Sequence, residues 1–327
     1  MGRKQGPRKG SMQFWPRKRA EKFLPRVNWK PILLKNADKK VGLLGFIGYK
    51  AGMASAFVKD NTPDSMTKGK RIIVPVTVIE CPPMKIFSVR FYKNGHIVKE
   101  VINENLDKEL KKVAKLPNEK TKVNTKETLE KINASDFDDI RVIVYPQVKK
   151  TGIKKTPDLA EIAVAGANIS DKLNFVKENL GREISVADVF QTGLVDVRGI
   201  TKGKGFQGPV KRFGIHLRQH KSEKGQRKPG SIGAWHPIGV RFTVPRPGQM
   251  GFFSRVIYNN LVIGSKKFSE NDAICRKIFD NYGQITSDYL ILKGSVQGPQ
   301  KRQVLLTTAF RPTKKQLKGN YELIELR

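Results

Sequence analysis

The chain has 327 residues, 63 Lys and Arg against 29 Asp and Glu, and a formal net charge of +34. A charge this large attracts a protein to nucleic acid or another anionic surface, and a small-molecule enzyme rarely needs it. The length predicts about two domains, each able to bury a core. No uninterrupted apolar run reaches membrane-spanning length, and the basic N-terminus lacks the apolar segment of a secretory signal. We therefore expect a cytoplasmic protein with no membrane partner.

The positive charge is concentrated in two segments. Residues 1–40 hold 13 Lys and Arg and two acids, and residues 198–255 hold another 13 with Glu223 as the one acid. These segments contribute +11 and +12 of the total, whereas residues 96–180 are close to neutral, with 16 basic and 14 acidic side chains. The pattern predicts an ordinary globular body that carries two basic extensions.

Both extensions lack the periodicity of a helix or strand. From Gly199 to Gly251 there are eleven glycines and five prolines, which predicts a long loop that takes its shape on a partner. All three tryptophans, Trp15, Trp29 and Trp235, lie in these segments. Aromatic faces among positive charges suit stacking on the bases of folded RNA. The alternative, which stays open for Trp29 and Trp235, is that the ring packs back on the body.

The rest of the chain alternates strand and helix patterns. Short apolar runs rich in β-branched residues predict strands, and Asn94-Gly95 between two such runs predicts a hairpin. The predicted strands are 42–49, 55–59, 71–80, 86–92, 96–102, 141–145, 184–190, 194–200, 255–263, 289–296 and 302–310. Predicted helices are 105–116, 125–133, a helix capped by Ser170 that ends at Gly181, and 270–282.

Strands before and after the charge-balanced stretch predict one β-barrel or sandwich that is split by an insertion. The fold class that we expect is mainly β with an α/β insertion. The predicted segments are 1–40, a basic N-terminal extension; 41–95, the first part of the barrel; 96–182, the α/β insertion; 183–200, barrel strands; 201–254, the basic central loop; 255–312, the final barrel strands and a helix; and 313–327, a C-terminal segment.

Motifs for catalysis or metal binding are weak. Cys81 and Cys275 form no metal-binding or disulfide pattern and are expected to be buried thiols. His216 and His220 are four residues apart with no acid between them, so we expect no metal site. Residues 203–208 fit the GxGxxG pattern, but a glycine-broken basic run follows in place of the helix that a dinucleotide fold requires. We predict no enzyme activity, cofactor or small-molecule substrate.

Five motifs in order along the chain carry a family resemblance. They are Gly-Tyr-Lys-Ala-Gly-Met at 48–53, Thr-Lys-Gly-Lys-Gly-Phe-Gln-Gly-Pro-Val-Lys-Arg at 201–212, Pro-Gly-Ser-Ile-Gly-Ala-Trp-His-Pro at 229–237, Pro-Gly-Gln-Met-Gly at 247–251 and Lys-Gly-Ser-Val-Gln-Gly-Pro-Gln-Lys-Arg at 293–302. With them the chain resembles the universal large-subunit ribosomal protein three family, in its archaeal form. The N-terminal segment around Trp15 departs from the family pattern.

The resemblance implies a translation-protein-type β-barrel whose tail and central loop thread into large-subunit rRNA. It also implies early assembly near the rRNA 3′ domain, neighbouring ribosomal proteins as partners, and a loop tip near the peptidyl-transferase region. Trp235 would be the tip residue, with His236 and Gln249 as polar neighbours. The remaining rRNA-binding residues that we predict are Lys202, Lys204, Lys211, Arg212, Arg218, Lys221, Arg227, Lys228, Arg241, Arg246 and Arg255 in the loop, and Arg3, Lys4, Arg8, Lys9, Trp15, Arg17, Lys18 and Arg19 in the tail.

Two other functions stay open at this point. The chain could be a general nucleic-acid-binding protein outside the ribosome that uses charge alone, which predicts no preference between duplex DNA and folded rRNA. The less favoured alternative is a nucleotide-binding enzyme that uses Gly203–Gly208, which predicts binding of NAD or ATP.

Overall fold

The computed structural model describes residues 12–37, 40–117, 124–236, 238–269 and 272–327. The chain divides into two compact units. Unit 1 comprises Met1–Lys22 and Ile200–Ser254, and unit 2 comprises Phe23–Gly199 and Arg255–Arg327. In the described parts of the chain, no helix combines the length and the hydropathy that a membrane crossing demands.

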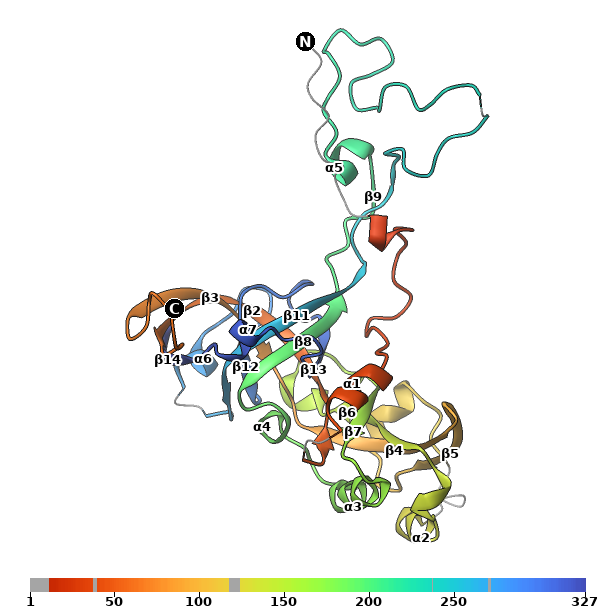
Figure 1. Ribbon diagram of the computed structural model, residues 1–327, viewed down its shortest axis with the longest axis vertical. Coiled ribbons are helices and arrows are strands. Elements are labelled where there is room, and N and C mark those ends of the chain that lie inside the picture. The colour runs from red at the N-terminus through yellow and green to blue at the C-terminus, as the bar shows by residue number, and fades with distance from the viewer. Residues whose placement is uncertain (1–11, 38–39, 118–123, 237, 270–271) are drawn as a thin grey trace. The chain divides into compact units, whose positions relative to one another are not determined.

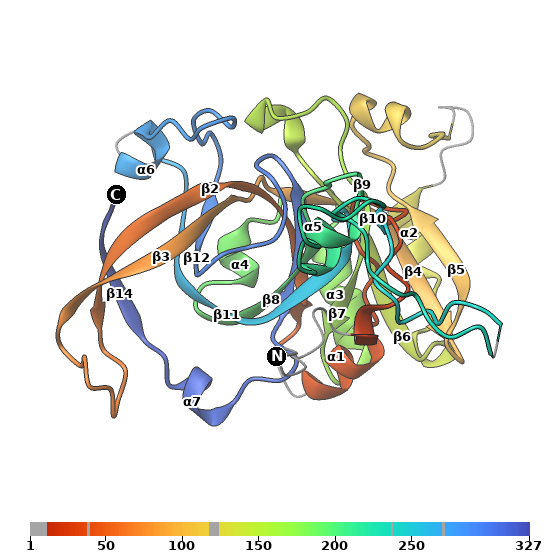
Figure 2. The same ribbon diagram turned by 90° about the horizontal axis from the view of Figure 1, so that it is seen from above.

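The larger sheet of unit 2 has seven strands (Figure 1). Their order is β13-β8-β11-β12-β3-β2-β14, and β13 also pairs with β2. The pairings therefore run from β2 through β3, β12, β11, β8 and β13 and return to β2. Figure 2 shows β2, β3, β12, β11 and β8 following one another along a curved path. The strands are β2 (Gly45–Asp60), β3 (Arg71–Glu80), β8 (Gly193–Ile200), β11 (Ser254–Lys266), β12 (Tyr289–Lys293), β13 (Gln303–Thr308) and β14 (Tyr321–Leu326).

A second sheet has the order β1-β7-β6-β4-β5. Its strands are β1 (Gly42–Leu43), β4 (Met84–Lys93), β5 (His96–Ile102), β6 (Asp139–Pro146) and β7 (Ala160–Ala165). The predicted hairpin is confirmed: Lys93 pairs with His96, and Asn94 and Gly95 have φ of 52° and 79°. The structure differs from the expected boundary between the first part of the barrel, 41–95, and the insertion, 96–182. Because a tight hairpin keeps its two strands in one sheet, β4 belongs with β5 to the second sheet. We call it the inserted sheet, since all its strands except β1 lie between Met84 and Ala165.

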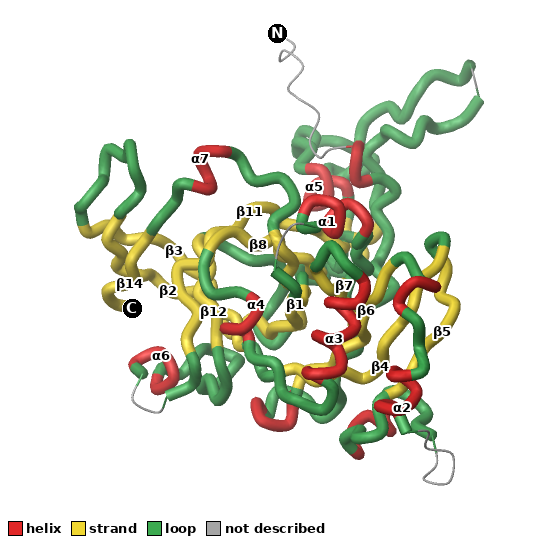
Figure 3. The backbone as a smooth tube through the Cα atoms, turned by 60° about the horizontal axis from the view of Figure 1, so that its bottom comes forward, coloured by secondary structure: helices red, strands yellow, loops and turns green. Residues whose placement is uncertain are grey.

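The helices are short, apart from α3. They are α1 (Lys30–Lys35), α2 (Thr125–Glu130), α3 (Ile169–Asn179), α4 (Val186–Val189), α6 (Ala273–Arg276) and α7 (Lys314–Leu317) in unit 2, and α5 (Pro209–Phe213) in unit 1; the 3-10 helices are η1 (Met12–Phe14), η2 (Lys108–Lys112), η4 (Ala134–Asp136) and η5 (Val148–Thr151). Figure 3 shows α1 and α3 beside the second sheet, where α1 contacts β7 and α3 contacts β6.

Two helix predictions and one strand prediction were wrong in extent or type. In the described residues of 105–116 and 270–282 the helices are η2 and α6 alone, so the apolar spacing there does not produce long helices. Residues 184–190 were predicted as a strand but contain α4. The Asp188 carboxylate accepts hydrogen bonds from the Ser185 amide and hydroxyl, both at 2.9 Å, and this capping arrangement begins a helix.

One apolar core joins the two sheets of unit 2. Phe46 and Ile47 of β2 pack in the same cluster as Val142 of β6 and Leu306 of β13, and all four are fully buried. A second cluster gathers side chains of β2, β3 and β12 around Phe279. The thiols of Cys81 and Cys275 are free and buried, as predicted, and burial raises the pKa of both.

Trp29 corrects the prediction for the N-terminal extension. Its side chain is only 2% exposed, and its Nε1 donates a hydrogen bond to the Glu161 carbonyl at 3.1 Å. Ile32, one turn further on, is also buried in the same cluster. The alternative that the ring packs back on the body therefore holds for Trp29. Residues 23–37 belong to unit 2, and the basic extension is shorter than the predicted 1–40.

Candidate nucleic-acid interface

Unit 1 brings the tail and the central loop into one folded unit. At the base of the loop, β9 (Phe206–Gln207) pairs with β10 (Gly248–Gln249) in antiparallel register. The pairing continues outside these strands, since the Lys204 amide donates to Met250 O and the Met250 amide donates to Gly205 O, both at 2.9 Å. Residues about 45 positions apart are thus held side by side. The base of the loop is structured without RNA, which the sequence did not lead us to expect.

Gly251 is the tightest point of this base. Its φ is +72°, and a Cβ there would lie 2.0 Å from the Lys202 carbonyl oxygen. Only glycine fits this approach of two backbones. The glycines at 203–208 lead into the same ladder and then into α5, which has five residues. Gly205 has φ of +63°, which glycine adopts readily, and the short α5 is not the long helix of a dinucleotide-binding fold.

Arg212 links the two sides of the loop. Its Nε donates to the Gln249 carbonyl at 3.0 Å and its Nη1 donates to the Arg246 carbonyl at 2.9 Å. Burial lowers the pKa of the Arg212 guanidinium, and an arginine side chain stays charged at neutral pH. The structure gives this side chain a positioning role within unit 1, in addition to the phosphate contact that we predicted.

An aromatic cluster ties the tail to the loop. The Trp15 ring lies 5.8 Å from Phe213 and 5.7 Å from Phe242, centroid to centroid. The Arg17 guanidinium lies 4.4 Å from the Phe213 centroid, and its Nη1 donates to the Arg212 carbonyl at 3.1 Å. Trp15 and Arg17 are half-buried in this cluster, so their main contacts are with protein. The rRNA contact of Trp15 stays a prediction.

Most predicted loop residues do lie on the surface. The exposed ones are Lys202, Lys204, Lys211, Arg218, Lys221, Arg227, Lys228, Trp235, His236, Arg241 and Arg246. Arg212, Gln249 and Arg255 are half-buried, and Arg255 belongs to unit 2. In the tail, Lys18 and Arg19 are exposed, whereas Arg3, Lys4, Arg8 and Lys9 lie outside the described residues.

Gln249 is not a neighbour of the tip in the way that we predicted. It lies in β10, paired with Phe206, and its Nε2 donates to the Gly251 carbonyl at 3.0 Å. The structure therefore places it in the ladder at the base of the loop. Trp235 lies far along the loop and is 76% exposed.

Between α5 and β10 the loop has little internal structure. Its hydrogen bonds include the Arg218 amide to Gln226 O at 3.0 Å and the Gln226 Nε2 to His220 O at 3.1 Å. Ile238 is 75% exposed, close to the 76% of Trp235. Large apolar side chains exposed among cations are typical of a surface that a partner covers.

The chemistry of this surface is recognition of anions. Lys and Arg side chains neutralise phosphates, and an exposed indole can stack on a base. Among the described residues, no group of three or more His, Cys, Asp or Glu side chains could hold a metal ion. His216 and His220 are both exposed.

Sequence reasoning missed the residues that organise unit 1. Phe213 and Phe242 were not singled out as cluster members. A local signal existed for α5, because Pro209 at its start and Gly214 after its end, with φ of 64°, are typical helix boundaries. Nothing local indicates that Trp15, about 200 residues earlier, packs on Phe213.

Comparisons with known proteins agree on one family. The family model described as "Ribosomal protein L3" matches residues 1–327. A protein of Methanocaldococcus jannaschii named large ribosomal subunit protein uL3 is 42% identical over 316 residues, which cover 94% of this chain and 92% of that protein. Proteins with the same name from Methanococcus vannielii and Methanococcus maripaludis are 42% and 41% identical, over 95% and 94% of this chain and 93% and 92% of their own lengths.

Proposed function

Because the chain belongs to the ribosomal protein L3 family, we propose that it is a structural constituent of the large ribosomal subunit that binds large-subunit rRNA. The observation that carries the rRNA contact is the character of unit 1. Its loop holds ten exposed or half-buried predicted cations, Glu223 as the one acid in 201–254, and the exposed Trp235. A surface of this kind is stabilised by a phosphate backbone and by bases that stack on it.

In this proposal the two units have different tasks. The six strands β2, β3, β12, β11, β8 and β13 form a translation-protein-type barrel, supported by the return of the pairings to β2. The barrel and the inserted sheet are the docking body, and unit 1 is the RNA-threading part. The aromatic cluster around Trp15 and the ladder at Gly251 give the loop a fixed base, so that only its outer part takes shape on RNA.

The family resemblance supports two finer proposals. The tip at Trp235 and His236 extends toward the peptidyl-transferase region, and the protein joins the subunit early, near the rRNA 3′ domain. Neighbouring large-subunit proteins are further partners. We assign no catalytic role, cofactor or small-molecule substrate to the chain.

Mapping where the purified chain protects full-length large-subunit rRNA from cleavage tests the proposal. We expect a limited set of protected regions, with an apparent affinity that falls steeply as salt rises. Equal affinity for duplex DNA and no preferred rRNA region would favour a general nucleic-acid binder instead. Saturable binding of NAD or ATP would favour the enzyme alternative.

A further inference from the structure

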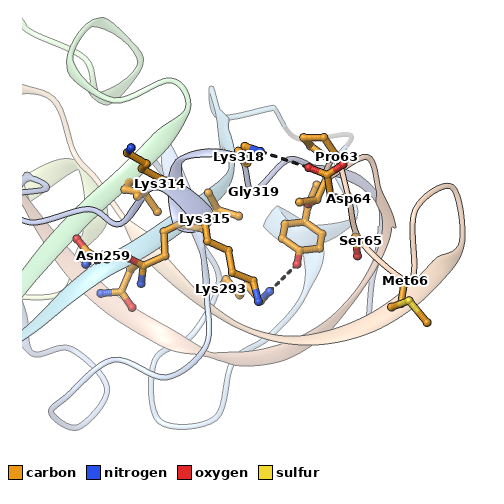
Figure 4. Close-up of a pocket in the computed structure, with 16 residues that line it drawn as sticks. Pro63, Asp64, Ser65, Met66, Asn259, Lys293, Lys314, Lys315, Lys318 and Gly319 are labelled. Atoms are coloured by element: carbon orange, nitrogen blue, oxygen red, sulfur yellow. Dashed lines mark hydrogen bonds and ion pairs between the residues drawn. The ribbon is translucent and has the colours of Figure 1, made fainter.

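Unit 2 contains a second cationic site, which lies apart in sequence from the tail and the central loop. It is a groove of about 820 Å³ bounded by the β2–β3 connection, the middle of β11, the end of β12 and the segment from α7 to β14 (Figure 4). Four lysines line it: Lys293, Lys314, Lys315 and Lys318. No arginine and one acidic side chain, Asp64, line it as well. Every lining residue belongs to unit 2.

The walls of the groove are fixed by hydrogen bonds. The Asn259 Nδ2 donates to Gln316 Oε1 at 3.1 Å, which joins β11 to α7. The Asn61 amide donates to Asn320 O at 2.9 Å, and the Asn320 amide donates to Thr62 Oγ1 at 3.1 Å, which joins the β2–β3 connection to β14. The groove is therefore a feature of the folded unit rather than an accidental gap between loops.

The lysines differ in what they contact. Lys318 forms an ion pair with Asp64 at 3.3 Å, and the Lys293 Nζ donates to the Tyr321 hydroxyl at 2.8 Å. Within the described residues, Lys314 and Lys315 form no ion pair or hydrogen bond through their side chains. Both side chains are exposed, and no acidic side chain of the described residues neutralises them, so they remain available to an external anion.

We propose that this groove binds a phosphate-bearing strand of RNA, with Lys314 and Lys315 as the main phosphate contacts. The groove is lined by four ammonium groups and one carboxylate, which favours a ligand with repeated negative charge, and a lysine ammonium group binds phosphate as a point charge. Leu194 and Leu261 also line the groove and offer apolar contact to a sugar or base. The inference rests on the proposed function, since it takes the polyanion to be rRNA, and it adds a body contact to those of unit 1.

The test uses the full chain with the double substitution Lys314→Ala and Lys315→Ala. The matched control is Lys111→Ala and Lys112→Ala, an exposed adjacent lysine pair on η2 of the same unit. The probe is full-length large-subunit rRNA. Two lost phosphate contacts should lower the slope of log affinity against log salt by about 1.4–1.8. The groove variant should also lose one protected rRNA region and keep those that depend on residues 201–254.

The control should retain that protected region and nearly all of the salt slope. The variant Lys314→Arg and Lys315→Arg should restore both, because it keeps the charge. Equal losses in the groove and control variants would overturn the proposal, since general charge would explain them. Unchanged rRNA protection together with loss of a neighbouring ribosomal protein from reconstituted subunits would assign the groove to a protein segment and would also overturn it. If the unaltered chain protects no preferred rRNA region, it is the proposed function that fails.

Discussion

The carboxylate of Glu80 is fully buried at the end of β3. It accepts hydrogen bonds from the amides of Thr286 and Ser287 at 2.8 and 2.9 Å and from the Tyr282 hydroxyl. Burial raises the pKa of Glu80 from its ordinary value of 4.5, and these hydrogen bonds oppose that rise without cancelling it. No cation pairs with Glu80 among the contacts of the described residues, so the charged form is held by neutral donors alone.

The substitution Glu80→Gln should flatten the pH dependence of stability. Because the folded pKa is raised, the carboxyl contributes most to stability below pH 4.5, and this contribution is lost as pH rises through the folded pKa. We expect the free energy of unfolding of the unaltered chain to fall over that range relative to the Gln variant. Urea unfolding at a series of pH values measures the difference. Parallel curves would contradict the raised pKa.

Trp29 and Trp235 should respond oppositely to truncation. Trp29→Ala leaves a cavity in the core of unit 2 and should cost about 3–5 kcal/mol of unfolding free energy. Trp235→Ala removes an exposed ring and should change stability by no more than about 0.5 kcal/mol, while it weakens rRNA binding. Urea unfolding and rRNA titration of both variants measure these effects. Equal destabilisation would be inconsistent with the exposed state of Trp235.

These two residues also show what the sequence could and could not predict. Both tryptophans lie in basic, glycine- or proline-containing surroundings, so composition treats them alike. The Trp29 ring fits only because residue 45 is glycine: a Cβ there would lie 3.0 Å from the ring. That contact depends on how β2 is placed by the rest of the sheet, and no local pattern encodes it.

The ladder at the base of the central loop gives a prediction for a whole element. Gly251→Ala forces a Cβ onto the Lys202 carbonyl at a φ where alanine alone is strained by about 1–2 kcal/mol. We expect β9 and β10 to separate, rRNA affinity to fall by about tenfold or more, and protease cleavage within 201–254 to increase. The core of unit 2 should unfold as before.

Gly230→Ala is the control for this element. Gly230 lies in the same loop, its φ is not in the left-handed region, and a Cβ there meets open space. Its rRNA affinity and its cleavage pattern should match those of the unaltered chain. Equal effects of the two substitutions would show that the loop responds to any added methyl group rather than to the ladder.

Elements were predictable where side-chain pattern decides them. The predicted strands 71–80 and 289–296 contain β3 and β12. β-branched and large apolar residues are buried on both faces in the second half of β3 and through most of β12. Helices were less predictable, since α6 has only four residues and η2 is a five-residue 3-10 helix. Apart from the hairpin at Asn94-Gly95, strand partners could not be predicted: β4 has the same pattern as the strands of the larger sheet but also pairs with β6, far along the chain.

At the scale of the whole molecule, the charge and the folded cores are largely separate. Deleting residues 210–250 removes nine Lys and Arg and one Glu but none of the residues of unit 2. The shortened chain should therefore keep cooperative unfolding of the body. If half of those cations contact phosphates, the salt slope of rRNA binding should fall by about 3. Titrations of rRNA with the shortened and the unaltered chain at several salt concentrations measure this slope. An unaltered slope would show that the loop is not the main RNA contact.

The location of the candidate interface could be predicted from the sequence, but the contacts that hold its side chains could not. Charge and aromatic composition located the central loop, and its cations are on the surface. Composition could not show that Trp15 packs on Phe213, or that Arg212 is held by two carbonyl oxygens. It also missed Lys314 and Lys315, because four scattered lysines have no local signature until the fold gathers them.

The return of the strand pairings to β2 determines when each sheet can complete its pairings during synthesis of the chain. The inserted sheet has all its strands once Ala165 has been made, whereas the pairings of the larger sheet cannot close before β13, at Gln303–Thr308, is available. Residues Gly45–Tyr49 of β2 therefore lack their β13 partner until about 250 further residues have been added. A newly made chain depends through that interval on whatever shields this open edge.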